Sequence, residues 1–448
     1  MVRVFSLLIV PVAVFVLFLP PNGFGEERKL TLTEAIKIAL DENYELRAAK
    51  NALFAQKEGV GIARSAFLPK LTFEERAART NNPPLSFMMK LNQQRFSQND
   101  FIVDALNNPQ PINDYQTAFF IEQPVFSMKS FVGLSIAKDE YAAQGGDYQR
   151  AKEETVFKVV QAYLRIHTAR EYLAVAQKGI EDAREHLRVA EVRYKNDLGL
   201  YSDSLRAATA LAEAEQVLVS SEKEYSVAKK WLGLMLASSA PVDIIDEDTS
   251  LSVKDLDYYK EVSLTRKDLA AMKMRYETAR KNIRVAESAY FPYIGVGGSY
   301  QMNDHRRLFG SEGDSWQASA FLRWELFDGT NREFQRSKAQ YQAAEAKEHV
   351  NSLREFISFK VDEAYLAVEE ARKHVDLAHT ALKNAEEGKR LVMSRYANSL
   401  SPIVDLLDVQ LNLNQARATA VARENAYTLT VISLGYESGT IMKDLNIE

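Results

Sequence analysis

A seven-residue ladder of apolar positions, present twice, constrains this chain more than any other feature of its sequence. In the first copy the large positions are Val159, Ile166, Leu173, Ile180, Leu187 and Tyr194, and the small positions are Ala162, Ala169, Ala176, Ala183 and Ala190. Adding 202 to each number gives the second copy, with Val361, Val368, Val375, Leu382, Lys389 and Tyr396, and with Ala364, Ala371, Ala378, Ala385 and Val392. A seven-residue repeat is the seam of a left-handed supercoil, and small residues let helix backbones approach closely. The ladder therefore predicts two long, matched coiled-coil helices.

The rest of the chain also repeats, and in the same order. Phe67-Leu68-Pro69 returns as Tyr290-Phe291-Pro292, and Val125-Phe126 returns as Leu326-Phe327. Self-similarity over such a span indicates an internal duplication. We expect a first repeat over 26–237, an inter-repeat linker over 238–262, a second repeat over 263–437 and a tail over 438–448.

Each repeat is predicted to contain the same elements. Thr31 and Glu34 form a capping-box signature for a short first helix. The first repeat then has strands at about 70–80 and 115–126, a long helix at about 129–198 and a helix at about 202–236. The second repeat has a helix at about 264–290, strands at about 293–303 and 315–327, and helices at about 330–398 and 402–435. Asparagine and proline pairs at both ends of residues 80–114 predict a loop there.

The first 25 residues are predicted to be a cleaved secretory signal peptide. A single charge at Arg3 precedes an apolar run from Leu7 to Leu19, which is too short for a stable membrane anchor. The chain has no cysteine, so after export its stability depends on packing or assembly rather than on disulfides. A net charge of -5 gives no reason to expect a nucleic-acid partner.

The four predicted strands are too few to form a membrane structure within one chain. The clearest strand alternates apolar residues, from Trp316 to Leu326, with mostly polar ones, as in a strand that faces lipid. A transmembrane β-barrel needs roughly eight strands, and open sheet edges leave backbone groups unpaired in lipid. We therefore expect a barrel shared between identical chains. A helix of about 70 residues is about 105 Å long, which suits the crossing of an aqueous compartment.

The sequence contains no recognisable catalytic constellation. None of its six histidines belongs to a metal-binding helix motif with an intervening glutamate, and His374 and His379 are five residues apart. We therefore expect neither an enzyme nor a cofactor or metal site. The main alternative to a channel is a periplasmic coiled-coil adaptor or structural protein without a pore. Such an adaptor would have one helical hairpin inserted into compact β modules, whereas this chain is predicted to have two hairpins.

In this order, the features resemble those of the TolC-type outer-membrane efflux family over nearly all of the mature chain. The junctions Gln123-Pro124-Val125-Phe126 and Glu325-Leu326-Phe327-Asp328-Gly329 add to the resemblance. It implies a mainly α fold with membrane β, in which a homotrimer forms a coiled-coil periplasmic barrel and a shared transmembrane β-barrel. It also implies a passive duct in the outer membrane, serving tripartite efflux or type I secretion. The implied partners are a periplasmic adaptor, an inner-membrane pump or secretion transporter, and outer-membrane lipid.

Four residues are candidates for the gate of such a duct. Asp405 and Asp408 share one helix face, beyond a Ser401-Pro402 pair that predicts a serine cap and a proline in the first turn. From the residues alone, acidic groups early in a helix are more often partners of the helix dipole. The resemblance instead implies carboxylate rings at the tunnel entrance, and a closed-state link between Tyr396 and Asp203. Tyr396 also continues the ladder, so packing is its alternative role. The arginine that some members place just before the gate aspartates is absent.

Overall fold

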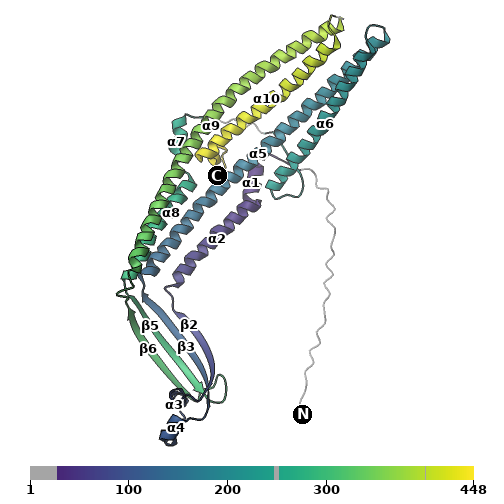
Figure 1. The fold of residues 1–448 in the computed structure, drawn as a ribbon. Coiled ribbons are helices and arrows are strands. Elements are labelled where there is room, and N and C mark those ends of the chain that lie inside the picture. Colours follow the sequence, from purple (N-terminus) through teal and green to yellow (C-terminus); the bar gives the residue numbers. More distant parts are fainter. Residues whose placement is uncertain (1–27, 247–251, 399, 448) are drawn as a thin grey trace, which may run out of the picture.

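The structure, a computed structural model, describes residues 28–246, 252–398 and 400–447. The predicted signal peptide at 1–25 lies outside the described residues. Figure 1 shows an elongated molecule with a β-sheet at one end, two helical hairpins ending at the other, and the C-terminus about midway. We call these regions the sheet end, the tips and the equator. No helix in the described ranges has both the length and the apolar character that crossing a membrane requires.

The two halves of the chain have the same order of elements. In the first half these are α2 (Tyr44–Ser65), β2 (Lys70–Thr80), β3 (Ile112–Phe126), α5 (Met128–Lys195) and α6 (Tyr201–Met235). In the second half they are α8 (Lys267–Glu287), η2 (Ser288–Tyr290), β5 (Tyr293–Asp304), β6 (Gly313–Arg323), α9 (Asn331–Ala397) and α10 (Ile403–Ser438). The predicted internal duplication is therefore confirmed, as is the mainly α fold class.

The two long helices contain the predicted ladders. α5 has 68 residues and α9 has 67, so each is about 100 Å long. Both run from the sheet end to the tips, where α6 and α10 return as the second arms of the hairpins (Figure 1). All five alanine positions of the α5 ladder, from Ala162 to Ala190, are buried, whereas Leu173 and Leu187 among the large positions are half-buried. The ladder ends differ, because Tyr194 is 46% exposed and Tyr396 only 4% exposed.

One antiparallel sheet joins the two halves at the sheet end. Its strand order is β2-β3-β5-β6, so the central pair β3–β5 links the first half to the second. The register of that pair shifts between Pro124 and Phe126, since proline has no N–H to donate to the ladder. β6 ends at Arg323, and Trp324 and Leu326 therefore lie beyond the strand that the sequence predicts to reach 327.

The predicted loop at 80–114 is wrong for part of its length. It contains α3 (Pro83–Asn92), η1 (Gln98–Phe101) and α4 (Val103–Asn107). The Asn82 side chain accepts a hydrogen bond from the Leu85 N–H, and Pro83 stands in the first turn. The asparagine and proline pairs thus start a helix, which is one of the structures they favour besides a turn. Edge-to-face contacts of Phe96 with Phe87 and Phe101 hold the segment together.

The largest core lies at the equator. There α1 (Leu32–Glu42) packs on α5, and β1 (Arg28–Leu30) pairs in parallel with β4 (Val242–Ile244). The predicted capping box is confirmed, because Thr31 and Glu34 exchange both of its hydrogen bonds. The linker also contains α7 (Leu256–Ser263), and the tail contains α11 (Ile441–Asp444). Ile441 and Ile447 are buried in the equatorial core, so the tail is a packed part of the fold.

Candidate functional site

All four long helices meet at the tips. Ala190 of α5, Ala207 of α6, Tyr396 of α9, and Ile403 and Leu406 of α10 form one buried apolar group, which we call the tip cluster. The two hairpins, α5–α6 and α9–α10, are therefore in direct contact at their ends. Because apolar contacts of this kind are lost when the hairpins separate, the tip cluster favours their closed arrangement.

The predicted gate aspartates lie on the exposed side of α10. Asp405 and Asp408 are both exposed, while Ile403, Leu406 and Gln410 on the opposite side are buried. Among the described residues neither carboxylate forms an ion pair. An exposed acidic face with no cation beside it in the described part of the chain is available to another molecule or to solvent.

The start of α10 differs from the prediction. The helix begins at Ile403 with Pro402 as its cap residue, so Ser401 lies one position before the cap. The Ser401 hydroxyl donates to the Asp405 carboxylate at 2.6 Å instead of accepting from a backbone N–H. The predicted serine cap and first-turn proline are therefore both wrong, and the serine instead hydrogen-bonds to one of the two predicted gate aspartates.

Tyr396 is held by an arginine that the sequence reasoning missed. Arg193, in the last turn of α5, donates from Nη1 to the Tyr396 carbonyl at 3.0 Å and from Nη2 to the Leu198 carbonyl at 3.2 Å. Its guanidinium carbon lies 5.0 Å from the centre of the Tyr396 ring, which is the geometry of a cation–π contact. A basic residue near a helix end commonly interacts with the helix dipole, so nothing in the sequence distinguishes Arg193 from such a residue.

Asp203 lies close to the same tyrosine without forming the predicted link. Burial raises the pKa of Tyr396 above 10.0, the Arg193 guanidinium lowers it, and the negative charge of Asp203 raises it. Within the described ranges no hydrogen bond joins the Tyr396 hydroxyl to Asp203. The Tyr396–Asp203 link thus stays a prediction, and the contact present in the structure is with Arg193.

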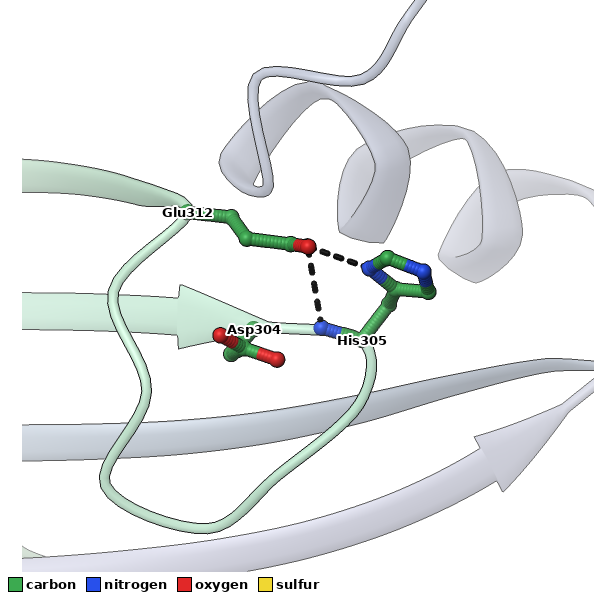
Figure 2. Close-up of side chains that lie close together, drawn as sticks. All are labelled: Asp304, His305 and Glu312. Carbon is green, nitrogen blue, oxygen red and sulfur yellow. Dashed lines mark hydrogen bonds and ion pairs between the residues drawn. The ribbon is translucent and has the colours of Figure 1, made fainter.

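A second group of polar side chains gathers at the far end of the sheet. Asp304, His305 and Glu312 lie at the β5–β6 connection, and their ligand-type atoms are within 4.8 Å of one another. Figure 2 shows the Glu312 carboxylate contacting both the ring and the backbone N–H of His305. Asp304 accepts from the backbone N–H groups of Arg306 and Arg307 at 2.6 and 3.0 Å. These bonds account for the group as the closure of a hairpin connection, with two arginines beside it.

The chain matches the family described as outer membrane efflux protein over residues 35–238 and 258–437, and it belongs to that family. A relative is the outer membrane efflux protein BepC of Brucella suis biovar 1 (strain 1330). BepC is 21% identical over 414 residues, which cover 88% of this chain and 84% of BepC.

Solved structures show the same fold. A membrane protein from Pseudomonas aeruginosa gives a TM-score of 0.78 at 18% identity, covering 92% of this chain and 91% of that one. The outer membrane protein VceC of Vibrio cholerae gives 0.73 at 17% identity, covering 91% and 96%. Family and fold together make this chain an outer-membrane duct for efflux or secretion, which is a transport conduit and not an enzyme. They decide against the periplasmic adaptor that the sequence left open.

Proposed function

We propose that three copies of this chain assemble into one duct, which spans the outer membrane and extends through the periplasm to a gate at the tips. This proposal is supported by the outer edges of β2 and β6, which pair with no other strand among the described residues and leave the sheet open on both sides. Open edges cannot stay unpaired in lipid, and a second copy can supply the missing neighbours. The duct is passive, and substrate is moved by an inner-membrane pump or secretion transporter reached through a periplasmic adaptor.

The observation that carries the gate is the exposed face of α10 at its tip end. If that face lines a threefold axis, Asp405 and Asp408 become two rings of three carboxylates about one helical turn apart. Such rings attract cations and repel anions at the narrowest point of a pore. The gate opens when the α9–α10 hairpin moves away from α5–α6, in a two-state motion biased by the docking partner. In this proposal Tyr396 and Asp203 lie where the hairpins part.

Conductance of the purified trimer in planar bilayers tests the proposal. Replacing Asp405 and Asp408 by alanine should lower the preference for cations over anions, since both rings disappear. A matched control replaces Glu386 and Glu387, two exposed acidic residues of α9 that lie farther from the tip. An unchanged ion preference in the aspartate variant would show that these residues do not line the entrance. If carbonate washed the wild-type protein from membranes, or if the protein never formed conducting trimers, the proposed duct would be contradicted.

A further inference from the structure

A second contact between the hairpins lies behind the tip cluster, toward the equator, and it is polar. Asp182 of α5 is 14% exposed and faces the α9–α10 hairpin. Its Oδ2 atom accepts from Lys389 Nζ of α9 at 3.0 Å and from Gln410 Nε2 of α10 at 3.0 Å. Arg417 Nη1, farther along α10, lies 3.9 Å from the same oxygen. One carboxylate therefore contacts both arms of the opposite hairpin.

Gln410 extends this contact into a buried network. It is 6% exposed, and its Nε2 also donates to Asn414 Oδ1 at 2.9 Å. Its Oε1 lies 3.4 Å from Nε2 of His186, which is 2% exposed and one turn beyond Asp182 on α5. The amide thus bridges two residues of α5 to α10. The three contacts of the Gln410 amide can form together only in one register of the two helices, and Nδ1 of His186 has no hydrogen-bond partner among the described residues.

The backbone geometry at this level brings α5 and α10 close together. Gly179 of α5 lies opposite Asn414, and a Cβ atom at Gly179 would be 3.3 Å from Asn414 Nδ2. A side chain at this position would require the Asn414 amide to shift by a few tenths of an ångström, which would disturb its hydrogen bond with Gln410. The small residue and the polar network therefore act at the same point of the interface.

The second ladder is interrupted at this same place. Lys389 occupies the seam position that Leu187 holds in the first copy. An apolar residue there would add to the seam through burial alone, whereas the lysine ties the seam to Asp182. A polar group at a coiled-coil seam lowers stability but specifies register and partner. The exception in the ladder is thus the place where one hairpin recognises the other.

Polar contacts suit an interface that must open. When apolar side chains separate, each exposes surface to water at a cost of about 25 cal/mol per Å². When a partly exposed ion pair separates, water solvates both charges and offsets most of the lost attraction. The Asp182 contacts therefore define a closed position without making opening prohibitively costly. They lie between the tip cluster and the equator, where a moving hairpin must part from α5.

We propose that Asp182 is a positioning residue for the gate, which holds α9 and α10 against α5 through Lys389 and Gln410 and so restrains opening. This inference rests on the proposed gated duct. It adds to that function a specific contact, behind the tips, that sets how often the closed duct opens.

Replacing Asp182 by asparagine tests the inference in the purified, full-length trimer. In planar bilayers the time-averaged conductance should rise several-fold, while trimer mass and thermal unfolding temperature stay close to wild type. The matched control is Glu181→Gln, which removes the same charge from the neighbouring residue. Glu181 is exposed and pairs with Lys178 of its own helix at 2.9 Å. Conducting Asp182→Asn trimers with wild-type conductance would overturn the inference.

A charge exchange distinguishes this contact from a general loosening. Asp182→Lys should open the gate further, because it places a third cation beside Lys389 and Arg417. Adding Lys389→Asp should return the conductance toward wild type, and a double variant as open as the single one would contradict the pairing. If the proposed duct were itself wrong, the result would be different, because the wild-type protein would then form no conducting trimers.

Cross-linking keeps the test independent of variants that fold poorly. The chain has no cysteine, so Asp182→Cys combined with Lys389→Cys supplies the only two thiols. A short bifunctional thiol reagent should lower the conductance of this variant below that of the same protein before treatment. Equal conductance before and after complete cross-linking would show that this contact does not restrain the gate.

Discussion

At both the equator and the tips, an arginine of α5 contacts a tyrosine of the opposite hairpin, but the two contacts have different surroundings. At the equator the Arg150 guanidinium lies 3.7 Å from the centre of the Tyr436 ring, and Nη1 donates to the Tyr436 carbonyl at 2.8 Å. At the tips Arg193, from the same helix, lies 5.0 Å from the Tyr396 ring and donates to the Tyr396 carbonyl at 3.0 Å. Each arginine of α5 thus holds one tyrosine of the opposite hairpin by its ring and its backbone.

The surroundings of these two contacts differ in size. The equatorial core contains 20 buried apolar residues, whereas the tip cluster contains five. In the equatorial core Ile432 of α10 and Ile441 and Ile447 of the tail pack with α1, α5, α6 and the β1–β4 pair. Full burial of a large apolar side chain contributes about 1.5–3 kcal/mol, so parting the two halves there would also disrupt the packing of the tail. The comparison supports a division of the proposed duct into a fixed base and a releasable end. The predictions below test that division, beginning with the base.

The largest effect is expected from Arg266, a buried equatorial arginine. It forms a two-point contact with Asp268 at 3.1 and 2.6 Å and donates to the Glu437 carbonyl at 2.7 Å. Arg266→Ala removes this two-point contact and the Glu437 hydrogen bond, but Asp268 is 22% exposed and keeps Arg150 at 3.8 Å, so the free energy of unfolding should fall by about 2–3 kcal/mol. Chemical denaturation measures the loss. Arg280→Ala, on the exposed side of the same helix, should change stability by less than about 1 kcal/mol, and an equal loss in both variants would contradict a fixed base.

At the releasable end, Arg193→Ala should increase conductance and change stability little. The variant loses the ring contact and the hydrogen bond to the Tyr396 carbonyl, the two contacts that reach the opposite hairpin, together about 1–2 kcal/mol of closed-state stability. Single-channel recording of trimers should show roughly a tenfold higher open fraction, since 1.4 kcal/mol corresponds to a factor of ten. Arg193→Lys keeps the charge but not the planar fork, so it should fall between wild type and alanine. A lysine variant identical to wild type would mean that charge alone closes the tips.

A smaller effect is expected from the predicted partner pair of Tyr396. Tyr396→Phe removes the hydroxyl but leaves the ring and the carbonyl that Arg193 contacts. Asp203→Asn removes only a nearby charge. Each should change closed-state stability by less than about 1 kcal/mol, the range of a single net hydrogen bond. If either variant opens the duct more than Arg193→Ala does, the Tyr396–Asp203 link is the main closure of the tips.

The smallest effect is a pH dependence through His186. Burial lowers the pKa of His186 below 6.5; the Gln410 contact opposes this shift and the charge of Lys389 adds to it. Asp182 and Glu185 also face the ring and act in the opposite direction to Lys389. The separated hairpins thus bind the proton better than the packed ones. The contribution of neutral His186 to the stability of the closed arrangement is therefore fully present above pH 6.5. It is lost as the pH falls through the lowered pKa of His186.

Conductance measured at a series of pH values from about 7 to 5 tests this dependence. The open fraction of the wild type should rise on acidification, by less than the effect of Arg193→Ala. His186→Gln provides the control, because it keeps a polar side chain that does not titrate in this range. Parallel profiles for the two proteins would assign the pH response to other groups.

Much of the fold follows from periodic features of the sequence. The ladders locate α5 and α9 because a seven-residue period persists over many turns, and the capping box locates the start of α1. The duplication follows from constant offsets between matched residues. These features are local or repeat along the chain, so a single sequence is enough to detect them.

The parts that were missed depend on contacts between distant residues. The helices within 80–114 depend on a cap and on aromatic packing, which turn-forming residues conceal. Asp405 and Asp408 were placed on one face from their spacing, but Arg193 and Asp182 look like ordinary surface charges in the sequence. Their roles require that α5 lie against α9 and α10. Lys389 is a visible exception in the ladder, but the seven-residue pattern does not predict that its partner is Asp182.

The equatorial core has a consequence for how the chain could be rewired. Leu30 near the start of the described residues and Ile447 near their end are buried in the same core. Neighbouring termini are the condition under which circular permutation is tolerated. A permuted gene in which residues 1–27 precede the second repeat, and a short linker joins residue 447 to residue 28, should encode the same packing. The fold would then not depend on which of the two repeats is synthesised first.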